Sequence, residues 1–198
     1  TVWHLFTIPQ QVTSAFIRGD SLRYYSPMKY FVVMFALSLL ISRGASFFDT
    51  MLIKELVENG IFSQEKAQAV FTDWNTAIYL PLVLILAIAT RGFFRHSGLN
   101  FAEHLVITTY GWAHIVLINT VAFQVLFAMK WFGFRGAWLI IFMLIAPAFW
   151  LWYCSAVFSQ RNLVGWLRAF VTLPFAYVCF LFLFLAVVAS IKLMQSIF

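Results

Sequence analysis

Charged residues are scarce in this chain, and their scarcity excludes an ordinary water-soluble domain. Only 10% of the 198 residues are Asp, Glu, Lys or Arg, while 63% are hydrophobic. Soluble domains carry about 25% charged residues. A soluble fold of this length cannot hide so much apolar surface, so we expect lipid to be the solvent for most of the chain. The 24 Phe and 8 Trp suit lipid-facing packing and interfacial aromatic belts.

Cysteines and catalytic motifs are also sparse. Cys154 and Cys179 lie inside apolar runs without CxxC spacing, which favours small buried side chains over a disulfide or a metal site. The sequence contains no HExxH, ExxH, GxSxG, P-loop or GxGxxG motif. We therefore assign no catalytic residue and no metal ligand, and no cofactor is implied.

The excess of positive charge is dispersed. The 13 Lys and Arg residues give a net charge of +6, but they stand singly or in pairs between apolar runs. This distribution is typical of topology signals and of contacts with anionic lipids, and it argues against a nucleic-acid partner. Seven of these residues fall on the side that holds the N-terminus and six on the other, but three of the six lie in the long acidic segment after the first expected span, where they count for less. This favours a cytoplasmic N-terminus, and the seven are Arg18, Arg23, Lys29, Arg91, Arg95, Arg161 and Arg168.

Long apolar runs predict an all-α fold, a polytopic membrane helical bundle with about five transmembrane helices. Residues 27–198 would form a single transmembrane bundle. The expected spans are about 27–42, 75–90, 101–128, 137–158 and 169–191. Residues 45–74 hold five of the seven acidic residues, and we interpret them as a short helical hairpin outside the hydrocarbon.

Residues 1–26 predict an amphipathic lead-in that lies at the membrane interface. Pro9 suits the first turn of a short helix, and Gly19 suits its end. Such a helix would lie in the plane of the interface. Its neighbouring cations are the residues that we expect to contact lipid headgroups: Arg18, Arg23 and Lys29.

The third span carries a line of polar residues on an otherwise apolar helix. At 100° per residue, Glu103, Tyr110 and His114 fall within about 20° of one another. With His104 and Asn119, which lie on the same helix, they form the set of candidate functional residues.

Two of these candidates have both a structural and a functional interpretation. Asn100 followed by Glu103 matches a capping box, in which the carboxylate bonds back to the helix start. His114 lies about 20 Å into the helix, near the bilayer midplane, where ionisable groups are rare. It is either a neutral histidine hydrogen-bonded to a neighbouring helix, or a group that binds a ligand or handles protons.

A metal site would need residues from several helices. Glu103 and His114 are about 16 Å apart along the helix, too far to share one ion. Glu103 or His104 could bind a metal only with groups from elsewhere, such as His4, Asp20 or His96.

Prolines interrupt three of the five expected spans, at Pro81, Pro147 and Pro174. A broken helix frees backbone carbonyls that can line a cavity, although proline kinks also serve helix packing. We favour the packing interpretation.

Two stretches resemble a known family. The first runs from Pro9 through Phe16-Ile17-Arg18-Gly19 and Arg23-Tyr24 to Pro27 and Tyr30; the second comprises Pro81 and Phe101-Ala102-Glu103-His104-Leu105-Val106. Together they resemble a family of bacterial integral-membrane domains of unknown function, many of which carry an N-terminal zinc ribbon. The resemblance covers most of residues 1–120 and implies a multi-pass protein of the bacterial cytoplasmic (inner) membrane. The chain departs from the family in having Tyr110 where a second histidine is expected, and in lacking the ribbon cysteines.

Three functions follow from these observations. The first is a non-enzymatic subunit or scaffold of a membrane complex, which would form a homo- or hetero-oligomer. The second is a small transporter or channel that uses the polar line of the third span. The third is an intramembrane enzyme acting on lipid, with Glu103 and His104 as acid and base near the headgroups.

Overall fold

The computed structural model describes the chain in five stretches, and every regular element in them is helical. The stretches are residues 1–20, 23–43, 75–130, 137–160 and 162–197. The elements are α1 (Val2–Thr7), α2 (Pro9–Ile17), α3 (Pro27–Arg43), α6 (Asn75–Phe93), the short 3-10 helix η1 (Arg95–Ser97), α7 (Phe101–Lys130), α8 (Ala137–Val157) and α9 (Leu163–Ile197). The predicted all-α class is thus confirmed for these stretches. The hairpin predicted at 45–74 lies outside them.

The lead-in contains two helices where the sequence predicted one. Pro9 occupies the first turn of α2, as expected. A residue before proline is disfavoured in the helical region, and Ile8 has φ −141° and ψ 58°, which ends α1. Gly19, with φ 89°, terminates the segment after α2. Val12 and Ala15 are buried, so the predicted apolar face packs inward.

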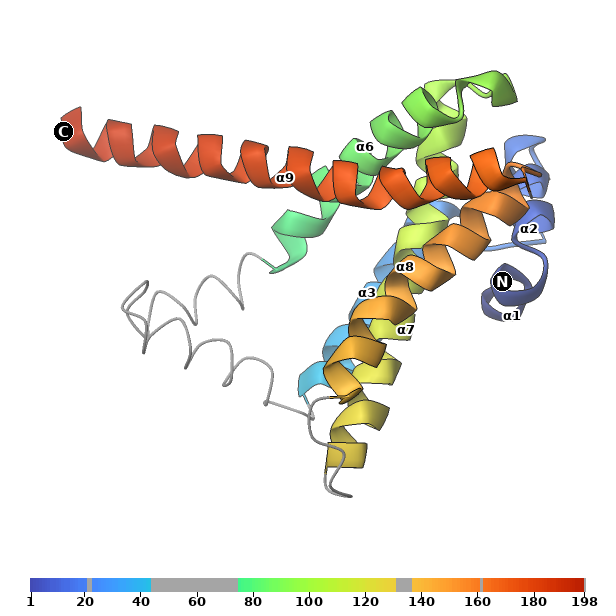
Figure 1. Cartoon of the computed structure of the whole chain (residues 1–198), viewed down its shortest axis with the longest axis horizontal. Helices are drawn as coiled ribbons and strands as arrows, with labels where there is room; N and C mark the ends of the chain where they lie inside the picture. Colours follow the sequence, from blue (N-terminus) through green and yellow to red (C-terminus); the bar gives the residue numbers. More distant parts are fainter. Residues whose placement is uncertain (21–22, 44–74, 131–136, 161, 198) are drawn as a thin grey trace.

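Helix α7 is the centre of the bundle, because it contacts α1, α2, α3, α6 and α8. Figure 1 shows α3 and α8 running alongside α7, while α9 extends past the other helices towards the C-terminus. Helix α9 packs against α6 and α8. The lead-in helices lie where α8 ends and α9 begins, since α2 contacts both α7 and α8.

Helices α3, α6, α7 and α8 begin and end within three residues of the expected spans, whereas α9 is longer at both ends than the span expected at 169–191. Helix α9 begins at Leu163, six residues before the predicted start of the fifth span, because Asn162 accepts a hydrogen bond from the backbone N–H of Gly165 at 2.8 Å. This cap lets the helix begin before Arg168.

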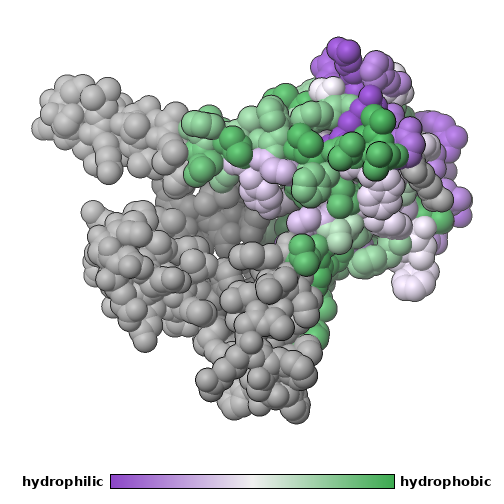
Figure 2. Space-filling model, in the orientation of Figure 1, coloured by the Kyte–Doolittle hydropathy of each residue, from purple (hydrophilic) through white to green (hydrophobic). Residues whose placement is uncertain are grey.

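Two helices in the described stretches are long and apolar enough to cross a membrane. They comprise residues Phe101–Ala122 of α7 and Leu163–Leu183 of α9. The comparable apolar stretches of α3, α6 and α8 are shorter: Pro27–Ser38, Pro81–Phe93 and Leu144–Val157. Figure 2 shows hydrophilic residues gathered at the end of the molecule that carries η1 and the lead-in helices, with hydrophobic surface over the described part of α9.

Candidate functional site

Helix α7 directs His114 towards α3. The His114 side chain is fully buried, and its Nδ1 forms a 2.6 Å hydrogen bond with the hydroxyl of Tyr30 on α3. The Phe6 ring of α1 lies 4.2 Å from the imidazole, centre to centre, and the Phe149 ring of α8 lies 5.1 Å from it. Four helices therefore meet at this one side chain, and aromatic rings enclose it.

Tyr110 lies one helical turn before His114 on α7 and also faces α3. Its hydroxyl donates to the backbone carbonyl of Tyr25, just before α3 begins. The rings of Tyr30 and Tyr110 are 5.8 Å apart, so the polar line of α7 and the start of α3 form one aromatic cluster. The predicted alignment of Tyr110 with His114 is confirmed by these contacts.

Glu103 caps α7. Its Oε2 accepts the backbone N–H of Asn100 at 2.7 Å, while Asn100 Oδ1 accepts the N–H of Glu103 at 2.9 Å. This reciprocal pair is the capping box that the sequence predicted, and it satisfies two N–H groups at the helix start. The carboxylate is therefore engaged in holding the helix terminus.

His104 points towards α8, away from the Tyr30 and His114 pair. It is fully buried and stacks on Phe158 with ring centres 5.4 Å apart. Phe158 in turn stacks on Phe94 at 4.1 Å, which joins the ends of α6, α7 and α8. Neither nitrogen of His104 has a hydrogen-bond partner in the described part of the chain. The structure thus does not bring Glu103 and His104 into a shared polar site.

Asn119 lies apart from the other four candidate residues. It lines a pocket of about 180 Å³ between α7, α8 and α9, together with Pro147 and Tyr177. The five candidates from the sequence therefore separate into a helix cap, an interhelical hydrogen-bonded cluster, a stacked histidine and a pocket residue.

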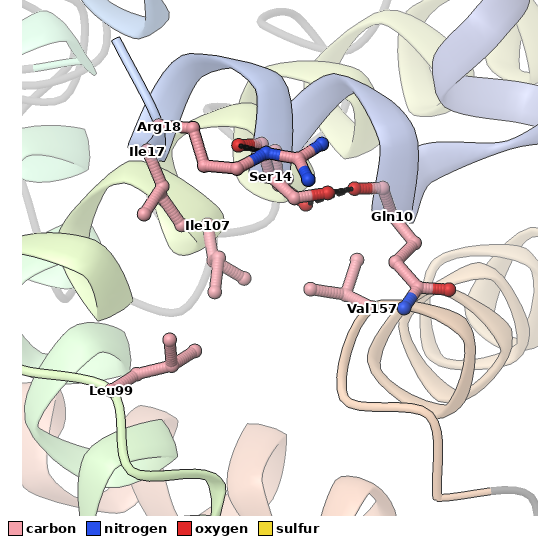
Figure 3. A pocket seen from close by; sticks show the side chains of 8 residues that line it. Gln10, Ser14, Ile17, Arg18, Leu99, Ile107 and Val157 are labelled. Carbon is pink, nitrogen blue, oxygen red and sulfur yellow. Dashed lines mark hydrogen bonds between the residues drawn. The ribbon is translucent and has the colours of Figure 1, made fainter.

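The three cations assigned to lipid headgroups are all exposed. Arg18 borders a second pocket, of about 140 Å³, between α2 and the facing ends of α7 and α8. In Figure 3 its guanidinium lies back along α2, where Nε donates to the Ser14 carbonyl at 3.2 Å. Arg23 lies over the Tyr24 ring at 5.8 Å.

Gln10, which also borders this second pocket, joins α2 to the end of α8. Its side-chain amide donates a hydrogen bond to the hydroxyl of Ser159 at 2.9 Å.

Two tyrosines that matter here were missed by sequence reasoning. Tyr30 was named from the sequence only within the family resemblance, and Tyr153 was not named. Tyr153 is fully buried on α8, and its hydroxyl donates to the Ile107 carbonyl at 2.8 Å. A tyrosine within an apolar run needs a partner for its hydroxyl, and that need was the available signal.

Metal coordination finds no support in the described stretches, where no three His, Cys, Asp or Glu residues are grouped closely enough to hold an ion. Cys154 is buried and Cys179 is partly buried, each as a free thiol.

The lead-in and the start of α3 resemble a known family. Residues 1–39 are similar to the family described as "Protein of unknown function (DUF3667)". This match covers 39 of the 198 residues, and the family description names no activity. Comparison with the curated proteins and with the solved structures found no match. The wider resemblance to bacterial integral-membrane domains with a zinc ribbon stays a prediction.

Proposed function

We propose that this protein is a non-enzymatic integral membrane protein that serves as a subunit or scaffold in a membrane complex. One observation carries the proposal: Tyr110 and His114 on α7 bond to α3 and to the chain just before it. Glu103 caps α7, Tyr110 bonds to the chain before α3, and His114 bonds to Tyr30. In a bilayer such interhelical hydrogen bonds serve packing, since exposed polar groups have no water to bind.

The proposal includes five membrane spans formed by α3, α6, α7, α8 and α9. Helices α6, α7, α8 and α9 have 19, 30, 21 and 35 residues, and α3 has 17. A span needs about 20 residues, with a range of about 17–25. Exposed cations at the hydrophilic end, such as Arg18 and Arg95, support a cytoplasmic N-terminus in a bacterial inner membrane and contact with anionic lipids.

Helix α9 offers the surface for a partner. At 1.5 Å per residue its 35 residues extend about 52 Å, well beyond the roughly 30 Å of bilayer hydrocarbon. Only 22% of its candidate span is buried within the chain, against 56% for α7. Its large exposed apolar side chains include Leu163, Leu167, Phe170, Val178, Leu181 and Phe182. A second copy of the chain or another membrane protein would cover this face.

The two alternative functions draw less support from the geometry. Transport through the polar line would need a hydrated path beside His114, whose ring instead contacts Phe6, Phe149 and Tyr30. Neither of the two pockets described above is lined by His114. Acid and base catalysis by Glu103 and His104 would need both groups at one site. Glu103 instead caps α7, and His104 stacks on Phe158 in the core.

The particle mass in mild detergent or in nanodiscs tests the proposal. We expect a protein mass above that of one 22.8 kDa chain once detergent or lipid is subtracted. Phe182→Ala should weaken the association, because Phe182 is 69% exposed on α9. Leu40→Ala is a matched control, since Leu40 is equally exposed on α3. A single chain without any copurifying protein would contradict the proposal.

A further inference from the structure

The pocket beside Asn119 is formed by three apolar helices. Its deep walls are Trp112, Ile115 and Leu173, which are at most 6% exposed. Ala146 and Pro147 of α8 complete one side, while Asn119 and Tyr177 are more accessible. Tyr177 is 49% exposed, so it lies where the pocket meets the surface. With a volume of about 180 Å³, the pocket can hold part of a small apolar molecule.

The Asn119 side chain, which lines this pocket, carries an unused hydrogen-bond acceptor. Its Oδ1 atom is buried and has no hydrogen-bond partner in the described stretches. A buried amide oxygen without a donor is unfavourable, and a ligand that brings a donor relieves that penalty. Sequence analysis had already singled out Asn119 as a polar residue within an apolar run, and no helix cap or interhelical bond accounts for this oxygen.

The position of the pocket decides what can reach it. Asn119 lies in the candidate span of α7, and Leu173 and Tyr177 lie in that of α9. Pro147 lies within the apolar stretch of α8. A ligand that enters between these helices arrives from the hydrocarbon, so its body must be apolar and its polar groups few.

We propose that this pocket binds a lipid-soluble molecule that carries one hydroxyl group on an apolar body. The hydroxyl donates to Asn119 Oδ1, and the apolar body packs against Trp112, Ile115 and Leu173. This binding site rests on the membrane spans proposed above, but it uses none of the side chains that join α7 to α3.

Photolabelling with a matched pair of probes tests the site. The full chain in nanodiscs is exposed to a long-chain fatty alcohol that carries a photoactivatable diazirine, and separately to its methyl ether. Labelled peptides are then located by mass spectrometry. The two probes share an apolar body, but only the alcohol donates a hydrogen bond. We expect the alcohol to label the pocket residues about fivefold more than the ether, as one hydrogen bond to a buried acceptor predicts.

Variants distinguish labelling that depends on the hydrogen bond to Asn119 from labelling that depends only on apolar packing in the pocket. Asn119→Leu keeps the side-chain size, and it should remove the preference for the alcohol while ether labelling persists. Thr120→Val is the control, because the Thr120 hydroxyl donates to the Val116 carbonyl and does not line the pocket. Ala146→Leu should reduce labelling by both probes, since it fills the cavity.

Three outcomes would overturn the proposal. They are equal labelling by the two probes in the parent, an alcohol preference that survives Asn119→Leu, and no label at the pocket. Gel filtration and thermal unfolding establish that each variant folds. If Asn119→Leu does not fold, Ala146→Leu decides the question, and undiminished alcohol labelling in that variant would refute the site.

Discussion

Tyrosine hydroxyls link the helices at the scale of single residues. Tyr30 reaches His114 on α7, Tyr110 reaches the Tyr25 carbonyl, and Tyr153 reaches the Ile107 carbonyl. Each ring packs among apolar neighbours while its hydroxyl finds a partner, which suits a tyrosine in surroundings without water. The bundle is therefore held by specific polar contacts within an otherwise apolar interior.

Tyr153→Phe should lower the free energy of unfolding by about 1 kcal/mol, because it removes only the hydroxyl that donates to Ile107. Unfolding by SDS titration in mixed micelles measures the change. Tyr25→Phe is the control, because the Tyr25 side chain is 63% exposed and its backbone carbonyl, which Tyr110 uses, is retained. We expect a cost below about 0.5 kcal/mol for the control. Equal costs for the two variants would contradict this assignment.

Sequence reasoning reached some of these residues and not others. The 100° spacing predicted that Tyr110 and His114 share a face, and the spacing of Asn100 and Glu103 predicted the cap, because both rules act within one helix. The partner of His114 comes from α3, 84 residues away in sequence, and no local pattern encodes that pairing. The pocket beside Asn119 likewise depends on how three helices pack.

At the scale of elements, the close approach of α7 and α8 depends on Gly111. A Cβ atom built at this position would lie 2.7 Å from Tyr153 Cε1 and 3.0 Å from Trp150 Cζ3. Small residues at helix interfaces allow such close contact in membranes. Both aromatic rings are fully buried, so they have little room to move away.

Gly111→Ala should therefore destabilise the bundle by about 1–3 kcal/mol through overpacking. Gly92→Ala provides a matched control on α6, where an added Cβ would meet nothing within 4 Å. Alanine favours the helix more than glycine does, so the control should be neutral or stabilising by up to about 1 kcal/mol. SDS titration measures the free energy of unfolding of the two variants. An unchanged free energy of unfolding in Gly111→Ala would contradict the prediction, since it would mean that α7 and α8 can move apart at no energetic cost.

Helix ends were predictable where their chemistry is local. Helices α3, α6, α7 and α8 begin at the residues where the sequence analysis began its expected spans, which are Pro27, Asn75, Phe101 and Ala137. The start of α9 was predicted too late, because the Asn162 cap, which lies before Arg168, was not recognised in the sequence. The break between α1 and α2 follows from Pro9, but whether a second helix forms before it depends on packing: Leu5 is buried, and Phe6 contacts His114.

At the scale of the whole molecule, the lead-in helices and the turn between α6 and α7 lie at the same end. Arg18 and Leu99 border one pocket, which also touches the end of α8 at Val157. If α7 crosses a membrane, these segments share one side of it. The proposed cytoplasmic N-terminus would place them on the cytoplasmic side.

Cysteine labelling tests this orientation. In a background with Cys154→Ala and Cys179→Ala, Asp20→Cys and Arg95→Cys each place a thiol at an exposed position of that end. A membrane-impermeant maleimide should label both in inside-out vesicles and neither in intact spheroplasts. Labelling of the two positions from opposite sides would exclude the arrangement, and labelling of both in spheroplasts would reverse the orientation.

The coupling between Tyr30 and His114 tests the central claim most directly, because the claim is that the polar line of α7 joins helices. Unfolding free energies are measured for Tyr30→Phe, His114→Leu and the double variant. The 2.6 Å hydrogen bond predicts that the double variant loses about 1 kcal/mol less than the sum of the single losses. Additive losses, within about 0.3 kcal/mol, would contradict the account, since they would mean that the two side chains do not stabilise the bundle through each other.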